Sequence, residues 1–258
     1  MPHSAKHSKQ AKITLIGAGP GDPELITLKA LKSLQTADVV MYDALVDKRL
    51  LEHAPEAIQV FVGKRGGKQY LAQTDINQLI VQNALNHGHV VRLKGGDSFV
   101  FGRGHEEMVY AQSFGIAVDL IPGITSAIAV PELQGIPVTR RGIAESFWVL
   151  TATNKEDELS KDIQLAVQST ATVIILMGTR KLAQIAALYK QANRSDTFIA
   201  VIQNGSQDNE EIALGQMSDI ENKVREKGIG SPAVIVIGEV VRTHSELITA
   251  YLEEAKVF

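Results

Sequence analysis

The sequence predicts an α/β protein of two domains, and three observations support this fold class. Apolar runs of strand length alternate with segments of helical period along almost all of the 258 residues. Three runs in the first half end in loops rich in glycine or proline, a pattern typical of the carboxyl edge of an open α/β sheet. The chain is also longer than a usual single domain. We therefore expect a flexible tail at 1–12, an N-terminal α/β domain at 13–135, a linker at 136–144 and a C-terminal α/β domain at 145–258.

The composition is that of an ordinary globular protein, with 45% apolar and 21% charged residues. The absence of cysteine excludes disulfides, thiolate zinc sites and iron–sulfur clusters, and we expect a cytoplasmic protein. The net charge of −3 argues against a nucleic-acid partner. The first twelve residues are basic but have no apolar core, so we expect neither a secretory signal nor a membrane span.

The stretch Ile13–Pro23, with the sequence ITLIGAGPGDP, runs from an apolar strand into three glycines and two prolines. The glycines allow positive φ and close backbone approach, and the prolines fix φ, so this loop is suited to holding a ligand. The dinucleotide-binding pattern G-x-G-x-x-G requires a third glycine where Asp22 stands. Because Asp43 lies at a suitable distance along the chain to bind a ribose, a dinucleotide site is one alternative. A connection without any ligand is another.

The leucines between 28 and 34 recur at helical spacing and predict a core helix capped by Asp22 or Thr27. A short apolar strand at 39–42 then ends at Asp43. Ligands of open α/β sheets bind at this edge, so Asp43 is a candidate site residue. The alternative is that Asp43 only caps the next helix.

A strand at 58–62 leads into the basic loop 63–68, GKRGGK, in which three cations and three glycines stand without an acid. Such a run is often a solvated surface loop. The sharper alternative is an anion-binding loop, because glycine backbone and cationic side chains can converge on one oxyanion. The cations are Lys64, Arg65 and Lys68.

Thr74 is expected to cap a helix through residue 87, and a strand at 90–93 opens onto a second glycine loop, 94–104. Its two adjacent glycines would let a ligand lie against the backbone, and its two phenylalanines would supply apolar walls. Asp97 offers a carboxylate for hydroxyls or an amine. A purely structural loop is the alternative.

A helix at 105–114 and a strand at 118–121 precede a third loop, 122–126, which leads into another helix. Three such loops on one sheet edge favour a single adenosyl-type or phosphate-type site over three unrelated turns. In the second half we expect strands at 147–151, 172–177, 198–202, 211–214 and 233–237, and helices at 181–191, 219–227 and near Ser245.

Other chemistry has little support in the sequence. The seven histidines show no paired ligand spacing, so we expect no metal site. The phosphate-binding pattern G-x-x-x-x-G-K-[ST] is absent, and Ser146 and Ser206 lack the G-x-S-x-G setting of a serine hydrolase.

Seven motifs in order span nearly the whole chain. They are GAGPGDP at Gly17–Pro23, YDALV at Tyr42–Val46, GKRGG at Gly63–Gly67, RLKGGD at Arg92–Asp97, FVFGRG at Phe99–Gly104, PGITSA at Pro122–Ala127 and GIPVT at Gly135–Thr139. This set closely resembles the uroporphyrinogen-III C-methyltransferases of the tetrapyrrole methylase family. The resemblance implies two α/β domains with S-adenosylmethionine bound in the cleft between them, and a homodimer. It also implies methylation of two pyrrole carbons of uroporphyrinogen III to give precorrin-2 for sirohaem or cobalamin.

The resemblance implies roles for individual residues. S-adenosylmethionine, which leaves as S-adenosylhomocysteine, would contact Pro20, Gly95, Gly96, Asp97, Val100, Thr125, Ser126, Met177 and Gly205. Asp43 would accept a proton and Lys64 would donate one. The tetrapyrrole substrate carries many carboxylates, which suit guanidinium and ammonium groups. The groups that would bind them are Arg65, Lys68, Arg103 and Arg140.

The chain departs from the family pattern at three places. Ser98 replaces the proline usual after GGD, Arg140 replaces the histidine usual in GIPVTHR, and Thr151–Thr153 stand where TGH is common. These departures bear on substrate handling more than on cofactor binding. Within the same fold, a precorrin methylase and an RNA or diphthamide methylase are alternatives. Outside it, an NAD-dependent dehydrogenase and a non-catalytic S-adenosylmethionine sensor are alternatives.

Overall fold

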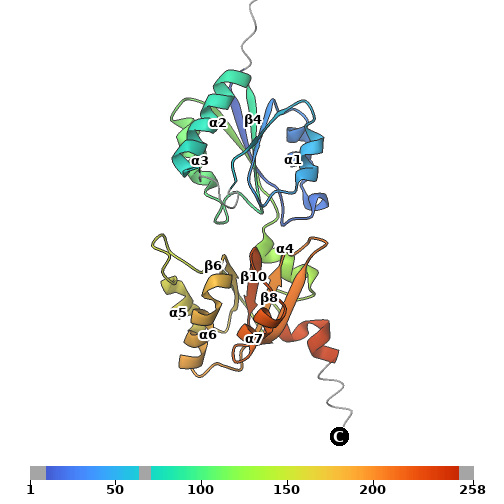
Figure 1. The fold of residues 1–258 in the computed structure, drawn as a ribbon, viewed down its shortest axis with the longest axis vertical. Coiled ribbons are helices and arrows are strands. Elements are labelled where there is room, and N and C mark those ends of the chain that lie inside the picture. The colour runs from blue at the N-terminus through green and yellow to red at the C-terminus, as the bar shows by residue number, and fades with distance from the viewer. Residues whose placement is uncertain (1–9, 64–70, 250–258) are drawn as a thin grey trace, which may run out of the picture. The chain divides into compact units, whose positions relative to one another are not determined.

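The structure is a computed structural model that describes residues 10–63 and 71–249. The chain divides into two compact units, the first ending at Thr125 and the second beginning at Ser126. Each unit contains one five-stranded sheet with helices packed against it (Figure 1). The predicted α/β fold class with two domains is confirmed.

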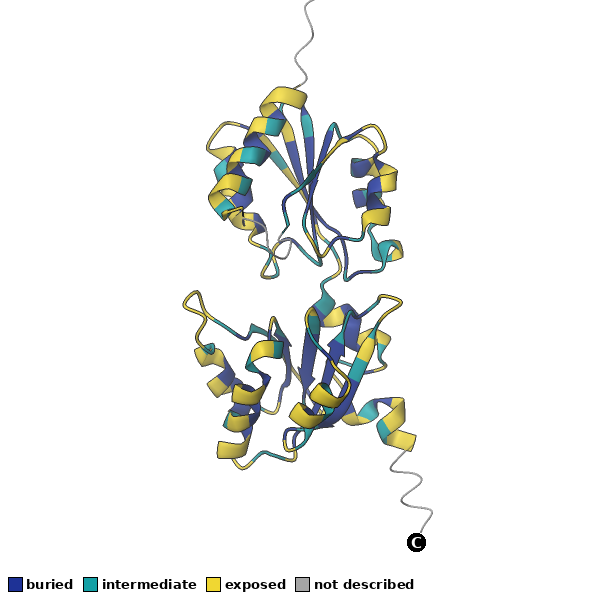
Figure 2. Ribbon diagram, in the orientation of Figure 1, coloured by how far each residue is buried: buried dark blue, intermediate teal, exposed yellow. Residues whose placement is uncertain are grey.

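The sheet of the first unit is parallel throughout, with the strand order β3-β2-β4-β1-β5. Its strands are β1 (Lys12–Gly17), β2 (Val39–Tyr42), β3 (Ile58–Phe61), β4 (His89–Lys94) and β5 (Ala117–Ile121). Alternate side chains of a strand enter cores on opposite faces. Ile13 and Val90 lie in one apolar cluster, whereas Ile16 and Leu93 lie in the other. The central strands are therefore buried on both faces, as Figure 2 shows and as parallel sheets require.

The helices of the first unit are α1 (Leu28–Leu34), α2 (Gln73–His87) and α3 (Gly104–Gln112), with 3₁₀ helices η1 (Pro23–Leu25) and η2 (Lys48–His53). Thr27 caps α1 by accepting a backbone N–H at 3.2 Å, whereas Asp22 caps η1. The expected cap of α2 is wrong, because Thr74 already lies inside the helix. The N-cap is Ala72, whose N–H donates to the Asp75 carboxylate at 3.1 Å.

The sheet of the second unit is mixed, with the order β6-β7-β10-β8-β9. Its strands are β6 (Phe147–Thr151), β7 (Thr172–Leu176), β8 (Phe198–Gln203), β9 (Glu211–Gln216) and β10 (Ala233–Ile237). β6 and β7 run parallel, whereas β10 is antiparallel to β7 and β8, and β9 is antiparallel to β8. Three strands, β6, β7 and β8, therefore point in one direction and two in the other.

The helices of the second unit are α4 (Ser126–Leu133), α5 (Lys161–Gln168), α6 (Leu182–Gln191) and α7 (Ile220–Glu226), with 3₁₀ helices η3 (Thr179–Lys181) and η4 (Glu239–Thr243). A last helical segment covers 245–249, as expected. α5 was not expected, although Ile163, Ala166 and Val167 recur at helical spacing and are buried. Among the described residues, no helix combines the length and the apolar composition needed to cross a bilayer.

The boundary between the units differs from the expected linker at 136–144. α4 belongs to the second unit, where Ala127 and Val130 share an apolar cluster with Ile174 of β7. Ile136 has no exposed surface and lies in the same cluster, so the expected linker is part of this core. The absence of helical period between 135 and 144 reflects an irregular core segment rather than a connection between domains. At the other end, Lys12 already belongs to β1, and residues 1–9 of the expected tail lie outside the described residues.

Candidate cofactor and substrate site

The loops that follow β1, β4 and β5 meet at the carboxyl edge of the first sheet, as the sequence predicts. The register pairs β1 with β4 and with β5 in parallel, so all three strands end at this edge. Two hydrogen bonds join the first two loops, from Gly19 N–H to the Gly96 carbonyl at 3.2 Å and from Gly96 N–H to the Gly19 carbonyl at 2.7 Å. The Ala18 N–H also donates to the Lys94 carbonyl at 2.7 Å. The glycine loops therefore form one connected edge.

Glycine is required at this edge because the loops touch through their backbones. A Cβ on Gly17 would lie 2.5 Å from the Gly123 Cα and 2.6 Å from the Gly96 carbonyl oxygen. A Cβ on Gly123 would overlap the same carbonyl oxygen. Gly96 also has φ at +65°, a conformation that disfavours residues with side chains. Glycine at these positions therefore lets the three loops pack backbone against backbone at the sheet edge.

Asp97 clamps two of these loops together. Its Oδ1 accepts the Phe99 N–H at 2.8 Å, and its Oδ2 accepts the Gly123 N–H at 3.0 Å. Sequence reasoning treated this carboxylate as a ligand group, whereas the structure gives it a supporting role in the loops. A carboxylate has about four acceptor positions, so these two bonds leave capacity for a ligand hydroxyl or amine.

The remainder of the second glycine loop carries strained and exposed residues. Phe101 and Arg103 have φ of +54° and +59°, which is costly for residues with side chains and recurs at functional sites. Phe99 and Phe101 are 49% and 44% exposed, so they supply the expected apolar surface. Arg103 forms a surface ion pair with Glu106 at 2.6 Å, and that hydrogen bond raises the pKa of its guanidinium.

Ser98 and Val100 shape the inner side of the same loop. Ser98, which departs from the family pattern, is buried, and its carbonyl accepts the Gly104 N–H at 2.9 Å. The Val100 N–H donates to the Asp97 carbonyl at 3.3 Å. The loop therefore closes on itself immediately before α3.

Asp43 directly follows β2 at the same sheet edge. Its Oδ1 accepts the Leu45 N–H at 3.2 Å, and its Oδ2 lies 3.6 Å from Nη2 of Arg92. The alternative that it caps the next helix is wrong, because Asp47 is the N-cap of η2. Asp43 therefore supports a turn and faces a buried cation, with 26% of its side chain exposed.

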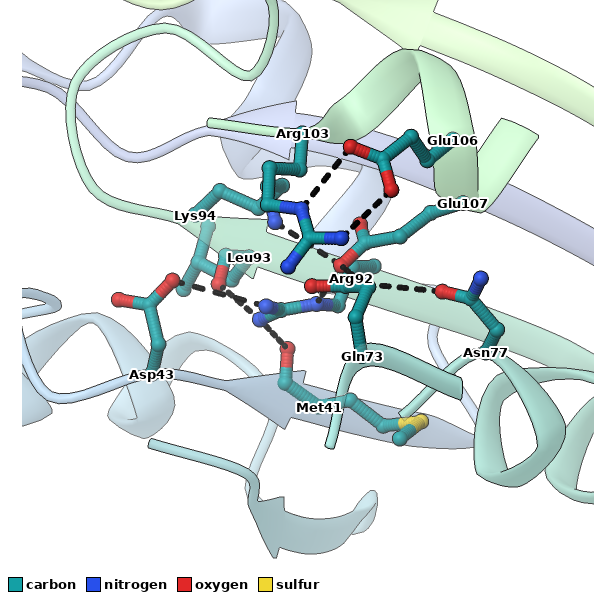
Figure 3. A network of polar contacts seen from close by, with 10 residues as sticks. All are labelled: Met41, Asp43, Gln73, Asn77, Arg92, Leu93, Lys94, Arg103, Glu106 and Glu107. Atoms are coloured by element: carbon teal, nitrogen blue, oxygen red, sulfur yellow. Dashed lines mark hydrogen bonds and ion pairs between the residues drawn. The ribbon is translucent and has the colours of Figure 1, made fainter. Parts of the chain in front are cut away.

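Behind Asp43 lies a buried ion cluster that sequence reasoning missed (Figure 3). Glu107 has no exposed side-chain surface, and its Oε1 lies 2.9 Å from Lys94 Nζ and 3.3 Å from Arg92 Nε. Burial lowers the pKa of the Lys94 ammonium, as does the charge of Arg92, whereas Glu107 opposes this shift. Two cations at alternate positions of a strand that is otherwise apolar could have revealed the cluster, because buried charges require partners.

In the second unit, Met177 and Gly205 lie at one edge of the mixed sheet. Leu176 of β7 and Ile202 of β8 both pair with Val234 of β10, so the two strands end at nearly the same level. Met177 is 60% exposed and has φ at +56°, a strained conformation that suits a contact residue.

Gly205 has a packing reason to be glycine. An added Cβ would come within 2.5 Å of the Val130 side chain of α4. Packing against Val130 therefore explains why residue 205 is glycine. This explanation is compatible with a ligand contact at the same residue.

A family model described as Tetrapyrrole (Corrin/Porphyrin) Methylases matches residues 12–221. The chain belongs to the tetrapyrrole methylase family. It is 47% identical over 233 residues to a uroporphyrinogen-III C-methyltransferase of Methanocaldococcus jannaschii, covering 89% of this chain and 96% of that protein. It is 43% identical over 238 residues to a siroheme synthase of Actinobacillus pleuropneumoniae, covering 92% of this chain but 49% of that protein. The chain therefore spans about half the length of this second relative.

The fold of this family member also matches a solved structure. That structure is the uroporphyrin-III C-methyltransferase of Thermus thermophilus in complex with S-adenosylhomocysteine. The TM-score is 0.77 at 36% sequence identity, and the match covers 90% of this chain and 99% of that one. The chain therefore resembles this enzyme in its three-dimensional fold as well as in its sequence.

The remaining residues implied by the family resemblance are distributed over both units. Pro20 lies in the loop after β1, Thr125 ends the first unit, and Ser126 begins α4 of the second. Arg140 is exposed and borders a cavity of about 460 Å³ in the second unit, which neither Met177 nor Gly205 lines. Lys64, Arg65 and Lys68 lie outside the described residues. Within the described part of the chain, no group of three or more acidic or histidine side chains could hold a metal ion.

Proposed function

We propose that this chain is an S-adenosylmethionine-dependent C-methyltransferase that methylates two pyrrole carbons of uroporphyrinogen III and yields precorrin-2. The observation that carries the proposal is the convergence of three glycine loops at one sheet edge, packed together at Gly17, Gly96 and Gly123, with the Asp43 carboxylate on the same edge. The names of the relatives in Methanocaldococcus jannaschii and Thermus thermophilus support the same substrate and cofactor.

We propose that S-adenosylmethionine binds through the residues that the family motifs indicate. When bound, it supplies a methyl group on a positively charged sulfur, which an electron-rich carbon can attack. Asp97, in the loop that also contains Gly95 and Gly96, retains acceptor positions for hydroxyls or an amine of the adenosylmethionine. The full set of proposed contacts is Pro20, Gly95, Gly96, Asp97, Val100, Thr125, Ser126, Met177 and Gly205.

Asp43 is the proposed proton acceptor. When a pyrrole carbon forms its new bond to the methyl group, the tetrapyrrole must later lose a proton, and a carboxylate at the strand end can take it. The Asp43 side chain is partly exposed and therefore accessible to a substrate, and the Arg92 guanidinium lies 3.6 Å from its Oδ2. Lys64 is the proposed proton donor, on the strength of the family motif alone.

The substrate carboxylates are proposed to bind Arg103 together with Arg65, Lys68 and Arg140. Arg103 stands at the exposed end of the second glycine loop, and a guanidinium matches a carboxylate in a bidentate manner. Its present partner, Glu106, is exposed and would be exchanged for the substrate at small energetic cost.

We further propose a cytoplasmic homodimer, with precorrin-2 passing to sirohaem or to cobalamin. The siroheme synthase relative supports the first of these two routes.

The decisive experiment is incubation of the purified protein with S-adenosylmethionine and uroporphyrinogen III under anaerobic conditions. We expect a product that is heavier by two methyl groups and has the absorbance of precorrin-2, together with S-adenosylhomocysteine. Omission of either substrate is the control. If a folded protein binds S-adenosylmethionine but forms no methylated product, the chain is a binding protein and the proposed activity is wrong.

A further inference from the structure

The buried ion cluster of Arg92, Lys94, Glu107 and Asp43 has no role in the proposed function beyond Asp43 itself. Its two cations and two carboxylates balance in charge. The centre of the cluster is Glu107 in the first turns of α3, whose Oε1 also accepts a hydrogen bond from Gln73 Nε2 at 3.2 Å. Its Oε2 is buried and has no hydrogen-bond partner among the described residues. A carboxylate held in this way is unfavourable for folding, which suggests a functional reason for it.

The contacts of the Arg92 guanidinium are unequal. Nε donates to Glu107, and Nη1 donates to the Leu93 carbonyl at 3.0 Å and to the Met41 carbonyl at 3.5 Å. Nη2 lies 3.6 Å from Asp43, beyond the about 2.7–2.9 Å of a charge-assisted hydrogen bond. Figure 3 shows Arg92 between Asp43 on one side and Glu107 on the other. The guanidinium is therefore held mainly by Glu107 and by backbone carbonyls.

We infer that Glu107 is a positioning residue that holds the Arg92 guanidinium back from Asp43, so that the Asp43 carboxylate is not locked into a tight ion pair. This inference rests on the proposed function, in which Asp43 accepts a proton. A carboxylate in a bidentate pair with arginine is a poor base, because its lone pairs are occupied. A cation held at 3.6 Å leaves the lone pairs of the Asp43 carboxylate available.

Lys94 has a separate part in this arrangement. It lies two residues after Arg92 on β4 and donates to the same Glu107 oxygen at 2.9 Å. Its charge compensates that of Glu107, so Glu107 can hold Arg92 without an uncompensated negative charge in the core. The charged groups around Asp43 in the described part of the chain are thus Arg92 and Lys94, with Glu107 behind them.

The test is the variant Glu107→Gln, compared with wild type. A neutral amide accepts from Arg92 more weakly than a carboxylate does, whereas Asp43 keeps its charge, so Arg92 should move toward Asp43. We expect a crystal structure of the variant to show Arg92 Nη2 at hydrogen-bond distance from Asp43. The kcat should fall by about ten- to a hundredfold, less than the loss of a general base, with KM for S-adenosylmethionine unchanged. The acidic limb of the kcat/KM profile should move to lower pH.

A double variant separates positioning from a merely structural role. Glu107→Gln alone leaves an excess buried cation and should lower the Tm, whereas Glu107→Gln with Lys94→Met restores the charge balance and should recover much of it. We expect kcat to stay low in the double variant, because Arg92 is still released toward Asp43. The control is Asp119→Asn, which removes an exposed ion pair with Lys12 in the same unit and should leave kcat and the pH profile unchanged.

Two results would overturn the inference. One is a Glu107→Gln structure in which Arg92 stays at 3.6 Å or farther from Asp43. The other is recovery of kcat together with Tm in the double variant, which would make Glu107 a structural residue only. A wild-type protein that forms no precorrin-2 would instead contradict the proposed function, and the Arg92 position in the variant would still decide the geometry.

Discussion

The two units differ in how their sheets direct the strand ends. All five strands of the first sheet end at one edge, so the glycine loops and Asp43 gather there. In the second sheet, β9 and β10 oppose β6, β7 and β8, and fewer loops share the edge that carries Met177 and Gly205. A parallel sheet collects polar side chains from distant parts of the sequence, whereas a mixed sheet divides them between two edges.

Buried charged side chains are also distributed unequally between the two units. Arg92, Lys94 and Glu107 are buried in the first unit. Among the described residues of the second unit, no lysine, arginine, aspartate or glutamate is buried. In the part of the chain that the structure describes, the first unit therefore holds its buried charges beside the glycine loops, whereas the core of the second unit contains no such charges.

The largest effect is expected for substitution of Asp43. A variant with unchanged turnover would contradict the difference drawn between the two units. Asp43→Asn should lower kcat by roughly a hundredfold or more, the range for loss of a general base, while calorimetric affinity for S-adenosylmethionine stays near wild type. Asp47→Asn is the matched control, because Asp47 also follows β2 but caps η2. Wild-type turnover in Asp43→Asn would reduce this carboxylate to a turn residue.

A second large effect is expected at the glycine edge of the first unit. Gly96→Val should abolish calorimetric binding of S-adenosylmethionine, because the side chain would occupy space proposed for the ligand. Gly115→Val is matched for backbone strain, since Gly115 has φ at +73° and an added Cβ meets nothing within 4 Å. Binding should survive in that control. Equal affinity in both folded variants would remove Gly96 from the site.

An intermediate effect is expected in the core of the second unit at alkaline pH. Burial raises the pKa of Tyr189 from 10.0 to about 12. Between these values the folded state binds more protons than the unfolded state, so the free energy of unfolding falls as pH rises, by about 2 to 3 kcal/mol in total. The only tryptophan of the chain, Trp148, packs against the same core, so its fluorescence reports unfolding of this unit.

Tyr189→Phe supplies the comparison for this measurement. Denaturant unfolding between pH 9 and 12 should show a shallower loss of stability in the variant than in wild type, because phenylalanine has no proton to lose. Identical slopes would mean that other groups dominate the alkaline unfolding of the second unit.

The smallest effect is expected for substitution of Met177. This substitution tests whether the second unit contributes a contact to the ligand. Met177→Gly relieves the positive φ and should raise the free energy of unfolding by about 1 kcal/mol or less, since the greater freedom of unfolded glycine offsets part of the gain. Affinity for S-adenosylmethionine should fall at the same time. Asn193→Gly is the control, because Asn193 has the same φ of +56° but is not a proposed contact. A stabilised Met177→Gly protein with unchanged affinity would assign the strain to folding alone.

The sequence by itself determined the elements and the chemistry that depends on local pattern. Strand and helix positions followed from periodicity, and the glycine loops followed from the need for positive φ, as at Gly96. The family motifs lie in those same loops, which is why the cofactor and the reaction class could be predicted. Local competition between neighbours caused one error, at Thr74 and Ala72 at the start of α2, and the sequence prediction also missed α5 and misplaced the boundary between the units.

Only the tertiary structure decided which of these residues meet. Glu107 reaches Lys94 and Arg92 across 13 and 15 residues, and Asp97 reaches Gly123 across 26. The assignment of α4 and Ile136 to the second unit likewise depends on packing against β7 and β10. Such contacts are set by strand order, register and the path of the chain over the sheet, none of which leaves a local periodicity in the sequence. The distance that separates Arg92 from Asp43 is a property of the fold for this reason, although both residues stand in motifs that the sequence displays.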